Sequence, residues 1–162
     1  YKPVNESKRK ELVCWSGTSG NFNFLYEIEE EIKHVLDKEN NWKLRVISNE
    51  KPDFKMLDEN KVEFIYWSPE SEVNSIAQSS IGIMPLPDNE WARGKCSLKM
   101  LQYMSCGLPV VVSHVGMNIE VLNLGNIGFG AKNLSPRFSR SSGILQSKYS
   151  FSESGEHNCS FK

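Results

Sequence analysis

The sequence predicts an α/β fold: a Rossmann-like, doubly wound parallel sheet with helices on both faces, spanning residues 11–131. Three observations predict it. Short apolar runs alternate with segments of helical periodicity, and turns rich in glycine and proline separate them. The run Val110-Val111-Val112-Ser113 lacks polar alternation, as expected for a strand covered on both faces. Strands and helices alternating at this spacing form a parallel sheet.

Each element has its own signal in the sequence. The expected strands occupy residues 11–16, 42–48, 62–67, 80–86, 110–113 and 127–129. A first helix is expected over residues 23–38, where apolar side chains recur at helical spacing and glutamates come early. Ser68-Pro69-Glu70 starts a second helix, with Ser68 as N-cap and Pro69 in the first turn. After a loop over residues 88–93, two further helices are expected at 95–105 and 118–124.

The remaining residues divide into two flanking segments. Residues 1–10 are polar and charged, which predicts an interdomain linker, and the missing initiator methionine suggests a trimmed fragment. Residues 132–162 contain nine serines and no clear core-forming face. We expect this Ser-rich tail to be poorly ordered, and a frameshift near Ala131 would explain its divergence.

Composition excludes several classes of function. The net charge of −1 gives no bulk attraction to nucleic acid, so a phosphorylated ligand would depend on a few placed cations. No apolar run is long enough to span a membrane. The four cysteines are widely spaced and form no CxxC pair, which argues against a zinc site. We interpret them as reduced thiols of a cytoplasmic protein.

The loops that follow the strands are the places to look for a ligand. Parallel sheets bind ligands at the carboxyl ends of their strands, here in loops 17–21, 67–70, 87–95 and 113–118. Gly17 and Thr18 follow the first strand, where the backbone could approach a phosphate, although an ordinary turn explains them equally well. Trp67 ends the third strand at the same edge. His114 also lies there, and a structural role is favoured for it.

A sharper candidate is the stretch 91–99, Trp-Ala-Arg-Gly-Lys-Cys-Ser-Leu-Lys. Arg93, Lys95 and Lys99 place three cations within seven residues at a loop-to-helix junction, and Gly94 permits close backbone approach. We expect Lys95 in the first helical turn, where a bound diphosphate would offset its conflict with the helix dipole. Gln102 follows the same face and could bond ribose hydroxyls. A solvated basic turn is the simpler alternative.

The stretch from Pro85 to Ala131, beginning PLPDNEWARGKCSLKMLQYMSCGLPVVVS, resembles the C-terminal domain of group 1 glycosyltransferases, the GT4-type enzymes of the GT-B fold. ELVCWSGTSGNFNFL resembles the start of that domain, and VEFIYWSPESEVNSIAQSSIGIMPLP resembles its middle. The similarity covers about residues 1–131.

The resemblance implies a function in two domains. Such enzymes move a sugar from a nucleotide diphosphate sugar donor, held by the C-terminal domain, to an acceptor held by an N-terminal domain absent from this chain. They require no metal and no other cofactor. A role in cell-envelope polysaccharide biosynthesis follows, and the missing domain would allow peripheral membrane contact. Lys95, helped by Arg93 or Lys99, is assigned to the diphosphate as the catalytic cation.

The sequence also departs from the family pattern. Two glutamates eight positions apart are common in the family, but Gly94 and Gln102 occupy these positions here. Gln102 could still hold the ribose as a neutral donor and acceptor. The usual Arg and Lys after the first strand are absent from residues 18–23.

Two other readings remain open. One is a non-catalytic α/β nucleotide-binding module, for which a receiver-like version lacks the acidic cluster it would need after the first strand. The other is half of a nucleotide-sugar epimerase, which acceptor dependence in an assay would distinguish. The isolated domain is expected to be inactive in transfer because half of the cleft is missing.

Overall fold

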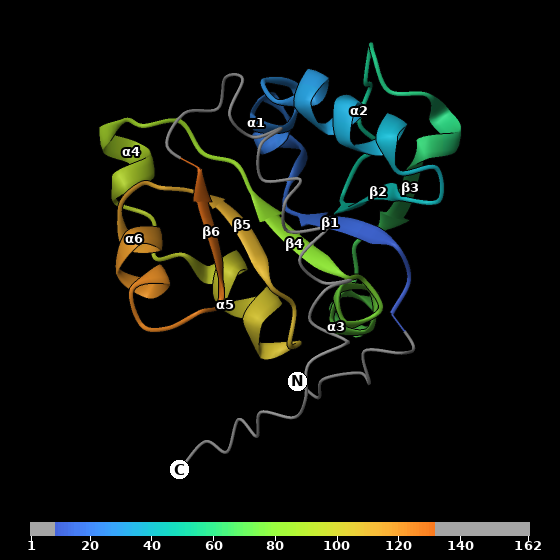
Figure 1. Cartoon of the computed structure of the whole chain (residues 1–162). Helices are drawn as coiled ribbons and strands as arrows, with labels where there is room; N and C mark the ends of the chain where they lie inside the picture. The colour runs from blue at the N-terminus through green and yellow to red at the C-terminus, as the bar shows by residue number, and fades with distance from the viewer. Residues whose placement is uncertain (1–8, 132–162) are drawn as a thin grey trace.

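The computed structural model describes residues 9–131. Six parallel strands form one sheet in the order β3-β2-β1-β4-β5-β6 (Figure 1). They are β1 Leu12–Ser16, β2 Lys43–Ser48, β3 Val62–Tyr66, β4 Ile81–Met84, β5 Val110–Ser113 and β6 Gly128–Ala131. The predicted Rossmann-like parallel sheet is confirmed. The expected linker 1–10 lies almost wholly outside the described residues, and the expected tail 132–162 lies wholly outside them.

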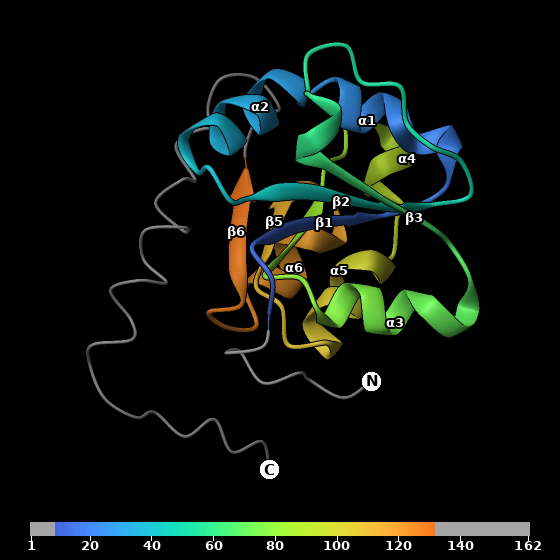
Figure 2. The same cartoon turned by 90° about the vertical axis from the view of Figure 1, so that its right-hand side faces the viewer.

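Helices cover both faces of the sheet, which gives three layers (Figure 2). They are α1 Phe22–Tyr26, α2 Glu29–Lys38, α3 Pro69–Ala77, α4 Glu90–Arg93, α5 Leu98–Ser105 and α6 Met117–Leu122, with 3-10 turns at Ser19–Asn21 and Glu59–Lys61. Helices α1 and α2 lie on one face, whereas α3, α5 and α6 lie on the other. None of the helices in residues 9–131 is long and apolar enough to cross a membrane.

Alternating side chains of the central strand supply two separate cores. Val13 and Trp15 pack with Leu25, Ile28 and other residues of α1 and α2. Cys14, which points to the opposite face, packs with the apolar residues of α3 and α5. Successive side chains of a strand point to opposite faces, so one strand serves both layers.

The predicted helix 23–38 is divided in two. Ile28 leaves the helical conformation (φ −118°, ψ 17°) and becomes the N-cap of α2. Leu25, before the break, and Ile28, at the break, are both fully buried. The prediction of one continuous helix was therefore wrong. The sequence did not indicate the break because the apolar spacing continues across it nearly unchanged.

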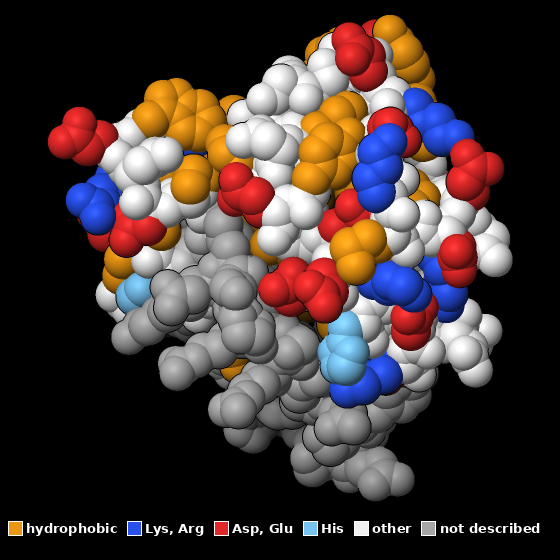
Figure 3. Space-filling view, turned by 90° about the horizontal axis from the view of Figure 1, so that it is seen from above, with side chains coloured by type: hydrophobic (Ala, Val, Ile, Leu, Met, Phe, Trp, Pro, Cys, Tyr) orange, Lys and Arg blue, Asp and Glu red, His pale blue; other side chains and the backbone are white. Residues whose placement is uncertain are grey.

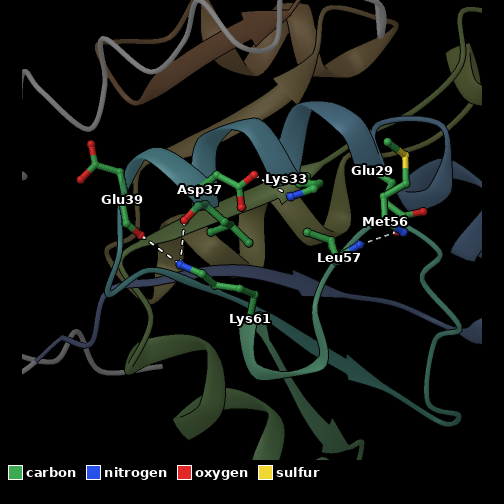
Figure 4. A network of polar contacts seen from close by, with 8 residues as sticks. Glu29, Lys33, Asp37, Glu39, Met56, Leu57 and Lys61 are labelled. Carbon is green, nitrogen blue, oxygen red and sulfur yellow. Dashed lines mark hydrogen bonds and ion pairs between the residues drawn. The ribbon is translucent and has the colours of Figure 1, made fainter.

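Polar contacts fix α2 against the segment that leads into β3 (Figure 4). Glu29 accepts hydrogen bonds from the backbone amides of Met56 and Leu57. At the other end, the Lys61 ammonium donates to the carbonyl oxygens of Leu36 and Asn40 at 2.7 and 3.0 Å. A cation among the last carbonyls of a helix is favoured by the helix dipole.

The segment before α5 also differs from the prediction. The expected loop 88–93 contains the short helix α4, whose N-cap Asn89 accepts a hydrogen bond from the Ala92 amide. Helix α5 begins at Leu98 rather than at residue 95. Its N-cap Ser97 has a left-handed backbone (φ 54°), which separates the two helices. Lys95 consequently lies in the connection between them and not in a helical turn.

Candidate donor site

A cavity of about 580 Å³ opens at the carboxyl edge of the sheet, beside the ends of β1 and β4. The strand order changes direction there, since the chain leaves β1 toward β2 and later returns to its other side as β4. Ligands of such sheets bind at this switch point. The lining residues come from five segments: Trp15, Ser16, Gly17, Thr18, Asn21, Phe24; Asn49; Trp67, Glu72; Ile83, Met84, Pro85, Leu86; and Gly94, Lys95, Cys96, Ser97, Leu98, Lys99, Tyr103.

The turn after β1 forms one wall of the cavity. A Cβ at Gly17 would lie 2.6 Å from the Trp15 ring, so this position has no room for a side chain. The Gly17 amide donates to the Ile47 carbonyl at 3.1 Å. That amide is directed into the sheet, and the expectation that it would face a phosphate is not met. Thr18 follows it as an exposed residue of the cavity wall.

Lys95 extends its ammonium group over aromatic rings. The nitrogen lies 3.6 Å from the centre of the Trp91 ring and 5.8 Å from that of Phe24. The two rings are themselves 5.7 Å apart. Partial burial lowers the pKa of Lys95, because removal from water disfavours the charged form. The ammonium is thus held at the cavity by cation–π contacts.

Within residues 9–131, Lys99, unlike Lys95, is paired with a carboxylate. Its ammonium lies 2.8 Å from Glu72 Oε1 and 3.3 Å from the Ser16 hydroxyl. Glu72 comes from the first turn of α3 and also accepts a hydrogen bond from Ser16 Oγ at 2.8 Å. Burial opposes ionisation of Glu72, but hydrogen bonds from Lys99, Ser16 and Trp67, with the Lys99 charge, lower its pKa. The carboxylate therefore neutralises Lys99 inside the cavity.

Tyr103 and Trp67 complete the same corner. The phenol oxygen of Tyr103, which is fully buried, accepts a hydrogen bond from the Ser16 amide at 2.8 Å. Burial raises the pKa of Tyr103 well above its ordinary value, so it stays a neutral phenol. Trp67 is 41% exposed and lines the cavity from the end of β3. An indole at this place offers a flat surface to a planar ligand group.

Two of the predicted residues lie outside the cavity wall. Arg93 forms an exposed ion pair with Asp88, with Nε and Oδ1 2.8 Å apart. Gln102 is half-buried on α5 and is not among the lining residues. The structure brings together the other six: Gly17, Thr18, Trp67, Gly94, Lys95 and Lys99.

Glu72, Ser16 and Tyr103 were missed by sequence reasoning. Glu72 has the sequence context of an ordinary acidic residue in a first helical turn, which the helix dipole alone would explain. Its partner Lys99 is 27 positions away, and no local spacing connects them. Tyr103 falls on the buried stripe of α5 and reads as a core residue. Only the three-dimensional fold brings these polar atoms together.

A buried hydrogen-bond chain holds the lysine-bearing connection in place. Ser97 Oγ donates to Asn118 Oδ1 at 2.6 Å, and Asn118 Nδ2 donates to the Ser113 carbonyl at 3.0 Å. Gly116 has a positive φ of 53°, and a Cβ there would lie 2.7 Å from the Arg93 carbonyl oxygen. The end of β5 and the start of α6 therefore pack directly against the segment that carries Lys95.

The face seen in Figure 3 carries interspersed acidic and basic side chains and separate hydrophobic patches, with no extended surface of one sign. Within residues 9–131 no three His, Cys, Asp or Glu side chains cluster as a metal site. Among these residues, the charged side chains that line the cavity are Lys95, Lys99 and Glu72.

A sequence model of the family described as glycosyl transferases group 1 matches residues 10–137. The chain belongs to this family. The resemblance inferred over about residues 1–131 is thereby confirmed for a group 1 glycosyl transferase domain. No curated protein sequence matches it significantly.

Solved structures show the same fold for the group 1 domain. The C-terminal domain of the group 1 protein LpcC from Francisella tularensis aligns with a TM-score of 0.57 and 14% identity over 86% of this chain and 76% of that one. TarM aligns with a TM-score of 0.58 and 14% identity over 90% of this chain and 30% of that one. A related structure names S. aureus as the source of TarM. Sucrose-phosphate synthase from Thermosynechococcus elongatus aligns with a TM-score of 0.55 and 14% identity over 90% of this chain and 40% of that one. The chain thus spans less than half of these two larger proteins.

Proposed function

We propose that residues 9–131 form the donor-binding domain of a glycosyltransferase that moves a sugar from a nucleotide diphosphate sugar to an acceptor. The observation that carries the proposal is the Lys95 ammonium, held at the cavity by aromatic rings rather than by a carboxylate. The cavity, of about 580 Å³, lies within the range of sites for ligands of this size.

The proposed chemistry is electrostatic. When the bond between the sugar and the diphosphate breaks, negative charge develops on the leaving oxygen. A fixed cation next to that oxygen stabilises the transition state more than the ground state. Lys95 supplies this cation in our proposal, and the amino end of α5, which starts at Leu98, adds its dipole. Trp67 provides a flat wall for the nucleoside part of the donor.

The wider assignment belongs to the same proposal. We infer a GT4-type enzyme that needs no metal, works in the cytoplasm on precursors of cell-envelope polysaccharides, and binds its acceptor on an N-terminal domain. The three cysteines of the described residues, Cys14, Cys96 and Cys106, are free thiols. In this proposal the full activity requires both domains, and the chain covers only 30% and 40% of the two larger relatives.

Ligand titration of the chain tests donor binding. UDP, GDP and their sugars are added separately while the thermal midpoint is recorded. A nucleotide that binds the folded state stabilises it by about 2.7 kcal/mol at a hundred times its Kd. Uridine and guanosine, which lack phosphates, serve as controls. If no diphosphate raises the midpoint more than its nucleoside does, the proposed function is wrong.

The role of Lys95 is tested in an enzyme that includes the acceptor-binding domain. Replacing one transition-state donor typically raises the barrier by about 3 kcal/mol. We therefore expect Lys95→Ala to reduce turnover by roughly a hundredfold. Lys33→Ala removes an exposed lysine that is paired with Asp37 on α2 and should leave turnover unchanged. Equal turnover of the Lys95→Ala and Lys33→Ala enzymes would exclude Lys95 from the reaction.

A further inference from the structure

The three cations of the stretch 91–99 differ in what holds them. Arg93 is paired with Asp88, and Lys99 with Glu72, each at 2.8 Å. Over residues 9–131, Lys95 forms no ion pair, and its contacts are the rings of Trp91 and Phe24. Arg93 and Lys99 are therefore neutralised locally, whereas Lys95 keeps an uncompensated charge.

The partner of Lys95 explains why the charge is kept. An aromatic face attracts an ammonium group through the ring quadrupole, but it carries no net charge. A carboxylate in the same place would fix the ammonium equally well and would also cancel its attraction for an anion. The contact with Trp91 at 3.6 Å is the closer of the two and supplies most of this attraction.

The Trp91 ring packs on Phe24, and the helix that carries it is fixed at both ends. The ring lies 5.7 Å from Phe24, a buried residue of α1. Helix α4, which carries Trp91, is N-capped by Asn89 and anchored by Ala92, which is 1% exposed. Gly116 packs against the backbone at Arg93, the last residue of the helix. Trp91 is more than half exposed and does not line the cavity, so it can affect a ligand there only indirectly, through Lys95 or Phe24, which both line it.

We propose that Trp91 is a positioning residue: its indole face holds the Lys95 ammonium at the cavity while leaving its full charge for the diphosphate of the donor. The inference rests on the proposed function and extends it, because it assigns a role to an exposed tryptophan outside the cavity wall. Phe24 packs against the Trp91 ring and supports it.

The contact between Lys95 and Trp91 is tested first without any ligand. In the chain labelled with ¹³C at lysine Cε, the ε-methylene protons of Lys95, assigned with Lys95→Met, should be shifted upfield by the indole ring current. Trp91→Leu should abolish this shift, and Trp91→Phe should retain part of it. Phe129→Leu, which removes another half-exposed aromatic ring, should leave it unchanged. An unshifted Lys95 signal in the unmutated chain overturns the inference, whatever the protein binds.

The second measurement compares binding of nucleoside diphosphates and nucleosides. Trp91→Leu should weaken UDP or GDP binding by about tenfold, as expected for a partly desolvated cation–π contact. Uridine or guanosine binding should not change, whereas a defect in the structure of the cavity would weaken it as well. Trp91→Phe should recover most of the loss. Unchanged diphosphate affinity in Trp91→Leu overturns the inference.

The two measurements separate failure of this inference from failure of the proposed function. A ring-current shift in a chain that binds neither UDP nor GDP overturns the proposed function, and the role of Trp91 in donor binding falls with it. A chain that binds a diphosphate but shows no ring-current shift overturns only the role of Trp91.

Discussion

Lys95 and Lys99 are four positions apart and line the same cavity, yet their charges are in different states. Glu72 compensates Lys99, whereas aromatic rings hold Lys95. The family resemblance implied that Lys95, helped by Arg93 or Lys99, would act on the diphosphate. The structure leaves Lys95 as the cation whose charge is available, a distinction that no local sequence signal contains.

The charge of Lys95 predicts a pH dependence of donor binding. Burial lowers its pKa from the ordinary 10.5, so the ammonium is lost at a less alkaline pH than for a free lysine. Affinity for a nucleoside diphosphate should therefore fall as the pH rises through this lowered value. Lys95→Arg keeps its charge throughout and should lack this fall. The ratio of the two Kd values across pH is the measurement, since titration of the nucleotide cancels in it. A constant ratio would contradict the prediction.

The Glu72 carboxylate predicts that the stability of the protein depends on pH in the acid range. Its folded pKa is below the ordinary 4.5, so it contributes stability above that value and loses it as the pH falls through the folded pKa. Glu72→Gln should lower the free energy of unfolding at neutral pH by about 2 kcal/mol, as for a lost charge-assisted hydrogen bond. The difference from the unmutated chain should shrink on acidification, as followed by urea denaturation. A difference that is independent of pH would exclude the Glu72 carboxylate as its source.

At the scale of single elements, predictability depended on how local the signal is. Strand β5 was placed correctly because an all-apolar run needs cover on both faces. Helix α3 was placed correctly because Ser68 and Pro69 are direct N-terminal signals, and the Ser68 side chain does accept from the Ser71 amide. The start of α5 was missed because Ser97 adopts a left-handed conformation, which a serine in the sequence does not indicate. The hydrogen bond from Ser97 to the buried Asn118 supports this conformation.

Strand β4 illustrates a close contact between sheet and helix. Gly82 faces α5, and a Cβ there would lie 2.4 Å from the Tyr103 ring. Gly82→Ala should therefore destabilise the protein by about 3 kcal/mol through overpacking and lower the thermal midpoint by roughly 10 °C. Gly20→Ala is the matched control, because a Cβ there meets nothing within 4 Å. Equal midpoints for the two variants would show that Tyr103 moves aside without cost.

At the scale of the whole molecule, the type of sheet followed from simple rules. Alternating strands and helices predicted a doubly wound parallel sheet, and the rules for such sheets predicted the edge where the cavity lies. The depth of the cavity and its polar corner could not be predicted, because they depend on side chains from segments far apart in the chain.

The sheet order also predicts where the molecule opens first. Strands β1, β4 and β5 are buried along their whole length, whereas β6 is an edge strand with half-exposed Phe129. Amides of β6 should exchange with solvent through local opening, and those of β1 and β4 only through global unfolding. Hydrogen exchange followed by mass spectrometry measures both. Equal protection of β6 and β1 would mean that the sheet opens only as a whole.

The place of β1 in the middle of the sheet has a consequence for synthesis. Its partner on one side, β2, follows soon in the chain, but β4 pairs with Val13 and Cys14 only after the intervening helices and strands have been made. During translation, β1 therefore keeps one hydrogen-bonding edge unpaired even after β2 has been made. Such an edge is a template for association with other nascent chains. The interval until Ile81 and Gly82 emerge is the period in which chaperones would matter most for this fold.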